Sequence, residues 1–385
     1  MSDCRTLMSW DPRYLDYDFG EGHPFSERSR GSAVRLLEAM RFFERPNISR
    51  QSEVSQIPDH MMLNFHTLRH VERVRRESES PEPGLLDHGD TPAFSGVWDA
   101  SRRVVSGTVH AVQSVVAGEF PHATNLAGGL HHASPGAASG FCVLNDVGVA
   151  IATGLKKDWF QRIAYIDIDA HHGDGVMYGF YGDGRVLDID FHQDGRTLFP
   201  GTGSLGEVGA EKGKGLKVNV PLPPGTGTED FLFLFERIVP GLLRDYRPEL
   251  IVMQSGVDAF SGDPLAHLEY TRRAYSGAVT LVHELAHELC HGRMVLVGGG
   301  GYSPASVARV LAQDALILSG NGVPQDDDPL PDTWRAEFTK EFSEAAPTTW
   351  GSGPHDAPRA WPAGAREKLL HQLSEHTGHP MGTGH

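Results

Sequence analysis

Short apolar runs alternate with longer amphipathic stretches along most of the chain. The runs are rich in Val, Ile, Leu and Met, as strands buried on both faces of a parallel sheet are. The longer stretches repeat apolar residues at helical spacing, which is typical of helices that cover a sheet. We predict strands over residues 6–10, 123–126, 163–168, 186–191, 216–220, 250–254 and 294–297, and helices over 32–43, 94–118, 229–243, 271–291 and 304–318. This alternation predicts an α/β fold with helices on both faces of a parallel sheet.

The composition changes near residue 325. We therefore predict a single domain over residues 1–325 and an extension over 326–385 that is rich in Pro, Gly and acidic residues. This composition predicts loops over 325–331 and 344–360. Residues 365–375 form a predicted helix with Leu369, Leu370 and Leu373 on one side. Such a stripe more often packs on its own domain than binds a partner.

Polar residues crowd the end of the strand predicted at 163–168. Because alternate residues of a strand share a face, Asp169 and His171 can project together, with Asp167 behind them and Asp174 in the turn beyond. A carboxylate beside an imidazole suits zinc or a similar divalent ion. The alternative is an acidic turn with a helix N-cap. Burying so many polar groups is costly unless they hold an ion or orient each other, which favours the metal site.

Two further strands end in candidate site residues. Asp258 follows the strand at 250–254 and can complete an Asp, His, Asp set that leaves a fourth position open, as in catalytic zinc sites. The strand at 294–297 runs into glycines 298–301, which deliver the hydroxyl of Tyr302 to the same edge of the sheet.

A tandem pair, His131 and His132, lies upstream of these strands. Each imidazole needs its own partner, and Asp167 and Asp174 are the natural candidates, since a carboxylate on Nδ1 fixes the tautomer. A surface turn is the alternative for such a pair, and the nearby metal ligands favour a functional one.

Six segments in a fixed order resemble the zinc-dependent histone deacetylase family. They are Gly-Gly-Leu-His-His (128–132), Ser-Gly-Phe-Cys-Val-Leu-Asn-Asp (139–146), Asp-Ile-Asp-Ala-His-His-Gly-Asp-Gly-Val (167–176), Phe-Pro-Gly-Thr-Gly (199–203), Gly-Val-Asp (256–258) with Gly-Asp-Pro (262–264), and Gly-Gly-Gly-Gly-Tyr (298–302). Segments 89–94 and 198–203 look most like the bacterial acetoin-utilisation branch. The resemblance covers roughly residues 8–325 and implies the arginase-like fold, with an eight-stranded, mainly parallel sheet.

The resemblance implies a metal-dependent amidohydrolase that removes an acetyl or other acyl group from the ε-amine of acyl-lysine in proteins. Deacetylation of a small amine, such as a polyamine or a biosynthetic intermediate, is the alternative, and a non-catalytic acyl-lysine binder is less favoured. Zn²⁺, or Fe²⁺ in its place, would be held by Asp169, His171 and Asp258.

The resemblance also implies roles for the remaining residues. His132 with Asp174 is our candidate for the general base, beside His131 with Asp167, although the sequence leaves the order of the two histidines open. Tyr302 would donate a hydrogen bond to the developing oxyanion.

Other positions match the family's substrate channel and its monovalent-cation site. Gly140, Phe141 and Phe199 match positions of the family's substrate channel, the two rings as its walls, with ordinary core packing as the alternative for either ring. Asp90 matches a carboxylate at the channel rim. A K⁺ site would use backbone carbonyls near Asp167, Asp169 and His171 together with Asp190 and Phe191, and Asp190 stands where the family often has Ser or Thr.

Charge and cysteine content restrict the partners and the compartment. The net charge is −16, from 34 basic and 50 acidic residues, which argues against direct nucleic-acid binding but not against a basic substrate tail. Three cysteines without metal spacing, and the lack of a signal-like or membrane-spanning apolar run, predict a cytoplasmic protein that binds no membrane. The oligomeric state stays open.

Three motifs have competing interpretations. His283-Glu-Leu-Ala-His287 matches the pattern of zinc proteases, but we predict an exposed helix face because no further ligand follows it downstream. The glycines at 298–301 fail the dinucleotide-binding pattern at Ser303. Cys142 is interpreted as a small buried residue under the pocket rather than a nucleophile.

Overall fold

A computed structural model describes residues 3–80, 82, 84–87, 89–351 and 361–381. Within these residues eight strands form one sheet in the order β2-β1-β3-β8-β7-β4-β5-β6, and every neighbouring pair is parallel. The strands are β1 (Thr6–Ser9), β2 (Ile48–Gln51), β3 (His122–Asn125), β4 (Ile163–Asp167), β5 (Val186–Gln193), β6 (Lys217–Leu222), β7 (Leu250–Gln254) and β8 (Met294–Val297). The predicted α/β fold with a parallel eight-stranded sheet is thus confirmed.

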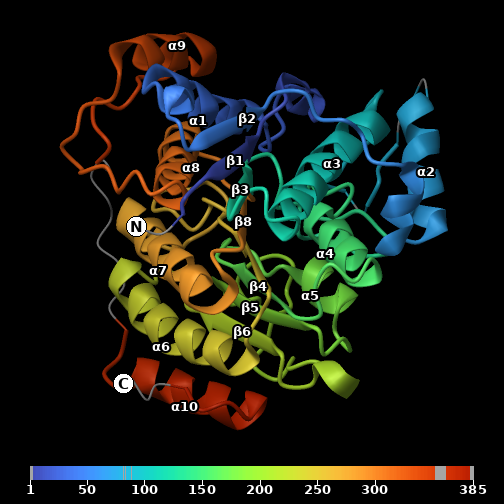
Figure 1. The fold of residues 1–385 in the computed structure, drawn as a ribbon, viewed down its shortest axis with the longest axis vertical. Coiled ribbons are helices and arrows are strands. Elements are labelled where there is room, and N and C mark those ends of the chain that lie inside the picture. The colour runs from blue at the N-terminus through green and yellow to red at the C-terminus, as the bar shows by residue number, and fades with distance from the viewer. Residues whose placement is uncertain (1–2, 81, 83, 88, 352–360, 382–385) are drawn as a thin grey trace.

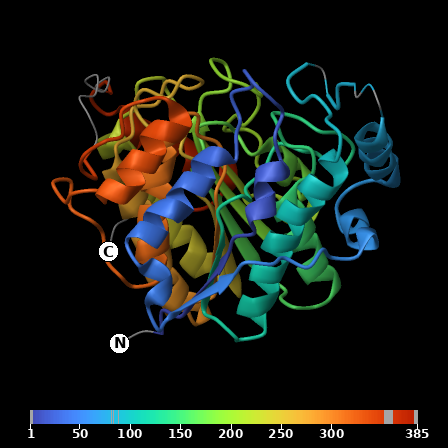
Figure 2. The same ribbon diagram turned by 90° about the horizontal axis from the view of Figure 1, so that it is seen from above.

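The helices cover both faces of this sheet (Figures 1 and 2). One layer holds α2 (Leu68–Glu79), α3 (Val97–Val116), α4 (Asp146–Lys156) and α5 (Asp174–Gly179). The other holds α1 (Arg28–Ala39), α8 (Pro304–Leu318), α7 (Arg272–Cys290) and α6 (Thr228–Tyr246), with α9 (Asp332–Phe342) against α1 and α10 (Ala365–Thr377) against α6. Because helices shield the sheet on both faces, β3, β4, β5, β7 and β8 are buried along their whole length.

The sequence pattern misses elements with a weak apolar signal. Strand β2 reads Ile-Ser-Arg-Gln and is only partly buried, because it lies at the edge of the sheet. Helix α2 is mostly charged, and α4 is built largely from small residues with little periodicity. The helix predicted over 32–43 begins at Arg28 and ends at Ala39, and Arg41 beyond it has left-handed backbone with φ 57°.

The C-terminal part of the chain contains two packed helices. Leu369, Leu370 and Leu373 are buried where α10 packs on α6 and β6, as the leucine stripe predicts. The division into a domain and an extension at residue 325 stays a prediction. Of the loop predicted over 344–360, residues 352–360 lie outside the described part.

None of the helices among the described residues is long and apolar enough to cross a membrane.

The carboxyl ends of three adjacent strands lie side by side in the middle of the sheet. The register pairs Val297 of β8 with Gln254 of β7, and Gln254 with Asp167 of β4. The loops after these strands therefore emerge together, and long loops gather at one end of the molecule in Figure 2. In open parallel sheets this edge is where ligands bind.

Candidate active site

The predicted metal ligands meet at this edge of the sheet. Asp169 and His171 follow β4, Asp258 follows β7, and their ligand atoms lie within 4.8 Å of one another. Nδ1 of His171 is 2.9 Å from Oδ2 of Asp258 and 3.2 Å from Oδ1 of Asp169. The three side chains are buried, so two carboxylates and one imidazole converge on a point shielded from bulk water.

Neighbouring groups orient the two carboxylates. Oδ2 of Asp169 accepts hydrogen bonds from Gln254 Nε2 (3.0 Å) and from the backbone N–H of Gly300 (2.7 Å). Oδ1 of Asp258 accepts from the backbone N–H of Ala170 at 2.7 Å. These fixed donors hold the ligand atoms in place before any ion arrives, as outer-shell partners of metal ligands do.

The ligand set fits a divalent cation. Burial, and then repulsion from Asp169, raise the pKa of Asp258 to about 6, so ionising both carboxylates here is unfavourable without a balancing charge. A divalent ion supplies that charge. Two oxygens and one imidazole nitrogen are the donor types that zinc accepts in catalytic sites, with a fourth position left for substrate or water.

Two histidine–aspartate pairs lie beside the ligand set. Nδ1 of His131 is 2.8 Å from Oδ2 of Asp167, and Nδ1 of His132 is 2.7 Å from Oδ1 of Asp174. The two Nε2 atoms are 3.1 Å apart. Each carboxylate therefore sits on the Nδ1 side of its ring, and the two Nε2 atoms lie within hydrogen-bonding distance of each other.

The two histidines differ in environment. Burial, and then the neighbouring His131, lower the pKa of His132 to about 4, so this ring is neutral near pH 7. His132 lines a narrow pocket, whereas His131 lies deeper, against Asp167. Asp167 also accepts a hydrogen bond of 2.6 Å from the hydroxyl of Tyr165.

A narrow pocket of about 210 Å³ leads to these groups. It is lined by Asp90, His132, Gly140, Phe141, His171, Leu198, Phe199, Leu265 and Tyr302. Phe199 stays 43% exposed, so its ring forms the rim and not part of the core. The four residues expected to bind substrate, Asp90, Gly140, Phe141 and Phe199, all line this pocket, and Leu198 and Leu265 are additions that the sequence did not predict.

The backbone around Phe141 has an unusual conformation that the surrounding structure holds. Gly140 and Phe141 both have positive φ, 53° and 67°. Two hydrogen bonds secure the turn: Tyr17 Oη donates to the carbonyl of Phe141 (2.6 Å), and the N–H of Phe141 donates to Thr91 Oγ1 (3.0 Å). A β-carbon on Gly140 would strike the His132 ring, so the turn requires glycine at this point.

Asn145 and Asp146 fix the loop that carries the histidine pair. Asn145 caps α4 and donates to the carbonyl of His131 at 3.1 Å. Asp146 accepts from the backbone N–H groups of Gly129 (3.1 Å) and Leu130 (2.8 Å). Both residues lie in the segment 139–146 singled out from the sequence, which gave them no role.

The positions expected to hold a monovalent cation also come together, at the ends of β4 and β5. Register pairs Asp167 with Asp190, and both are buried. The carboxylate of Asp190 accepts from the backbone N–H of Gly173 (2.7 Å) and lies 2.6 Å from Nδ1 of His192. Phe191 packs against Phe231 and Phe235 of α6.

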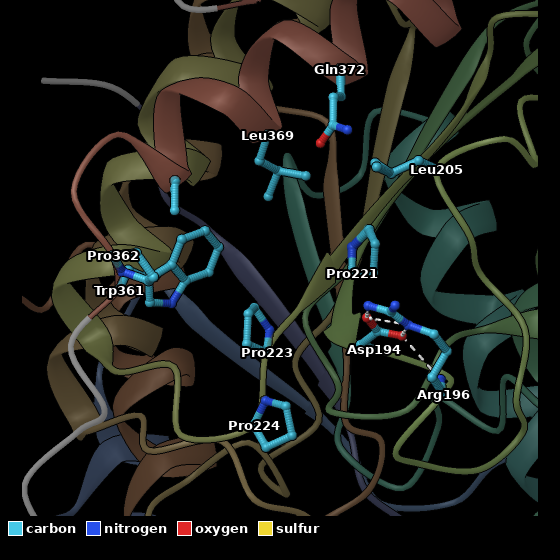
Figure 3. Close-up of a pocket in the computed structure, with 11 residues that line it drawn as sticks. Asp194, Arg196, Leu205, Pro221, Pro223, Pro224, Trp361, Pro362, Leu369 and Gln372 are labelled. Carbon is cyan, nitrogen blue, oxygen red and sulfur yellow. Dashed lines mark hydrogen bonds and ion pairs between the residues drawn. The ribbon is translucent and has the colours of Figure 1, made fainter.

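Residues of the loop between β5 and β6 line two different cavities. Its residues Leu198 and Phe199 line the substrate pocket, while Asp194, Arg196 and Leu205 line a cavity of about 500 Å³ on the other side. Figure 3 shows that cavity between the C-terminal helix and the sheet edge. Its lining includes Trp361, Leu369 and Gln372 on the helix side and Pro221, Pro223 and Pro224 opposite.

Gly300→Ala tests how tightly the ligand set is packed. A β-carbon at Gly300 would collide with Oδ2 of Asp258 and lie 2.8 Å from Oδ2 of Asp169. We expect kcat to fall about 10²-fold, because a displacement of about 1 Å at reacting groups has that effect, and metal affinity to fall with it. Gly136→Ala is the matched control, since a β-carbon there meets nothing within 4 Å. Unchanged kinetics and metal content in Gly300→Ala would mean that the carboxylates move freely.

The fold and the site together define a hydrolase of the arginase/deacetylase fold. Its three candidate metal-ligating side chains and its two His–Asp pairs lie at the carboxyl edge of a parallel sheet. The histone deacetylase domain matches residues 23–317. The chain belongs to the histone deacetylase family and is a deacetylase of that family.

Similar proteins span nearly the whole chain. The chain is 35% identical to the acetoin utilization protein AcuC of Bacillus subtilis (strain 168) over 367 residues, which cover 91% of this chain and 90% of that protein. It is 34% identical to AcuC of Staphylococcus xylosus over 343 residues, covering 87% and 88%. AcuC of Staphylococcus aureus (strain MSSA476) is 32% identical over 359 residues, covering 90% and 89%. The resemblance to the acetoin-utilisation branch is thereby confirmed.

Proposed function

We propose that this enzyme removes an acetyl group from the ε-amine of acyl-lysine in proteins. The observation that carries the proposal is the shape of the pocket: a channel of about 210 Å³ between Phe141 and Phe199 ends at His132, His171 and Tyr302. Two aromatic walls suit a slender alkyl chain, and the reactive groups at the bottom suit the amide that the chain carries. The non-catalytic alternative is disfavoured because ligands, histidines and tyrosine are all present.

Asp169, His171 and Asp258 would hold zinc, or ferrous iron in its place. When bound there, the ion supplies a Lewis acid that polarises the amide carbonyl and lowers the pKa of water. His132 takes the proton from water at Nε2, with Asp174 on Nδ1 keeping the ring oriented. It then passes that proton to the leaving amine. We assign the base to His132 because it lines the channel.

Tyr302 and His131 support the same step from two sides. Tyr302 lies at the bottom of the channel with the imidazoles of His132 and His171. Its hydroxyl donates a hydrogen bond to the oxygen that gains negative charge as the carbonyl is attacked. His131, hydrogen-bonded to Asp167, lies behind His132 and lowers the pKa of the neighbouring ring, which favours release of the proton to the leaving amine.

One residue at the rim of the pocket can distinguish a peptide substrate from a small acetylated amine. Asp90 lines the rim, and its carboxylate can accept a hydrogen bond from a backbone N–H of a bound peptide. A simple acetylated amine has no backbone amide to offer. An acetyl-lysine side chain and a small acetylated amine both fit the channel. The contribution of Asp90 to substrate binding therefore decides which of the two is the substrate.

Asp90 predicts a pH dependence of substrate binding. Burial, and then the nearby Asp87, raise the pKa of Asp90 to about 6. Asp90 accepts from the peptide while ionised, so KM for an acetyl-lysine peptide should rise as the pH falls through about 6. Asp90→Asn should abolish this rise and increase KM at pH 8 by about 10- to 100-fold, the value of a charge-assisted hydrogen bond. KM measured from pH 5 to 8 checks it.

A small acetylated amine is the control for this prediction. It lacks the backbone amide, so Asp90→Asn should leave its KM unchanged. Equal effects of the substitution on peptide and amine would show that Asp90 shapes the rim without touching substrate.

The decisive experiment for the proposal is a substrate panel. Acyl-lysine peptides of increasing acyl length and acetylated polyamines are compared by kcat/KM with the same metal-loaded enzyme. We expect the acetyl-lysine peptide to give the largest value. A polyamine that exceeds every peptide by tenfold or more would assign the enzyme to small-molecule deacetylation.

Three further properties belong to the same proposal. A K⁺ ion would bind between Asp167 and Asp190 through carbonyls of the β4 and β5 ends, and exchange of K⁺ for a larger organic cation should lower activity.

We place the enzyme in the cytoplasm on its cysteine content. We expect no direct binding to nucleic acid or membrane, since the net charge is −16.

A further inference from the structure

Four metal-ligating side chains converge at the edge of the sheet opposite the active site. His122 is the first residue of β3, Cys4 lies just before β1, and His283 and His287 are one turn apart on α7. Figure 1 places the segment that leads into β1 beside α7. His122 is fully buried and the other three are partly buried. The cluster thus lies at strand amino ends, far from the carboxyl ends that carry the deacetylase residues.

The cluster has the dimensions of a tetrahedral metal site. Nε2 of His283 is 3.0 Å from Nε2 of His122 and 3.2 Å from Nε2 of His287, and Sγ of Cys4 is 4.0 Å from Nε2 of His283. Ligand atoms of all four lie within 4.8 Å of one another. With Zn–N bonds of about 2.0–2.1 Å and a Zn–S bond of about 2.3 Å, tetrahedral geometry separates two nitrogens by about 3.3 Å and nitrogen from sulfur by about 3.6 Å.

Protons alone do not satisfy this arrangement. Nε2 of a neutral imidazole carries either one proton or one lone pair, and Nε2 of His283 faces two other Nε2 atoms at once. At most one of those two contacts can be a good hydrogen bond. Three imidazole Nε2 atoms and one thiol sulfur converge on one point, where a cation would satisfy all of them.

The motif His283-Glu-Leu-Ala-His287 was predicted to be an exposed helix face, and that prediction is wrong. The two histidines turn inward to His122, and Glu284 between them is exposed. The protease interpretation fails as well, because the thiol of Cys4 stands at the fourth position that a hydrolytic zinc keeps open.

We propose that Cys4, His122, His283 and His287 form a second, structural metal site that takes a zinc ion. One thiolate and three imidazoles are a donor set that zinc favours, and four protein ligands leave no position for water. The ion fastens the segment before β1 to α7 and β3, three elements distant in sequence.

Metal counting on the untagged, full-length protein tests this site. After zinc loading and removal of free metal, the parent should hold two zinc ions per chain. His283→Ala and Cys4→Ser should each hold one, His171→Ala should hold one, and His171→Ala/His283→Ala should hold none. His291→Asn, just past the end of α7 and exposed, is the matched control and should hold two. A parent with a single zinc that His171→Ala removes would overturn the proposal.

Cobalt substitution distinguishes the two sites without relying on activity. Asp169, His171 and Asp258 offer only oxygen and nitrogen, so a thiolate-to-cobalt charge-transfer band in the near ultraviolet reports on Cys4 alone. The band should persist in His171→Ala and disappear in Cys4→Ser. In the His171→Ala background zinc should also raise Tm, because a ligand that binds only the folded state stabilises it. A band that survives Cys4→Ser, or a Tm unaffected by zinc, would contradict a structural site here.

Discussion

His171→Ala should lose the active-site metal and deacetylation together. The imidazole of His171 is the only nitrogen ligand of the set, and its Nδ1 lies within 3.2 Å of carboxylate oxygens from both other ligands. Without it, two buried carboxylates remain, and their affinity for zinc is far lower. We expect zinc content to fall by one ion per chain and kcat to fall more than about 10³-fold, since the ion supplies several kcal/mol of transition-state stabilisation.

Asp169→Ala and Asp258→Ala should have the same effect. Elemental analysis and steady-state rates on the same preparations check all three variants. His267→Ala is the control. The side chain of His267 is exposed, and its backbone N–H and carbonyl form hydrogen bonds, to Gln193 and Gly225, that the substitution keeps. A His171→Ala protein that keeps the metal content of the parent would place the ion elsewhere.

Tyr302→Phe should lower kcat by about 10²–10³ and leave KM nearly unchanged, as when one oxyanion donor is removed. The substitution keeps the ring that packs edge-on against Phe141, with centroids 5.9 Å apart, so fold and metal content should survive. The lost hydrogen bond forms mainly in the transition state, which is why the effect falls on kcat.

Steady-state kinetics on an acetyl-lysine peptide decides this second prediction. Tyr178→Phe is the matched control, since its hydroxyl bonds to Glu207 on the surface and its loss should not affect turnover. If Tyr302→Phe stays within about threefold of the parent kcat, a difference under about 1 kcal/mol, Tyr302 only lines the pocket.

Much of the fold and of the candidate site could be predicted because both leave local marks in the sequence. A strand buried on both faces is a short apolar run, and carboxylates directly after such a run are costly unless they bind something. Asp169 and Asp258 stand at such points, so their meeting at one sheet edge follows from parallel strands. The edge strand β2 and the charged helix α2 lack this contrast and were missed.

Other parts of the site depend on contacts that no local pattern records. Tyr17 holds the carbonyl of Phe141 across 124 positions, and Thr91 holds its N–H across 50. His283, whose helix face was misjudged, meets His122 from 161 positions away. A sequence motif on a helix shows which side chains share a face, and only the fold shows what that face meets.

An inhibitor can reach the loop between β5 and β6 from two sides. A compound in the channel meets Phe199 from the front and binds next to groups that the family shares. A compound in the cavity of about 500 Å³ would press on the loop from behind, against Trp361 and Leu369. Those two residues lie outside the matched domain at 23–317. Chemistry aimed there needs no metal-chelating group, and its selectivity would come from residues outside the matched domain.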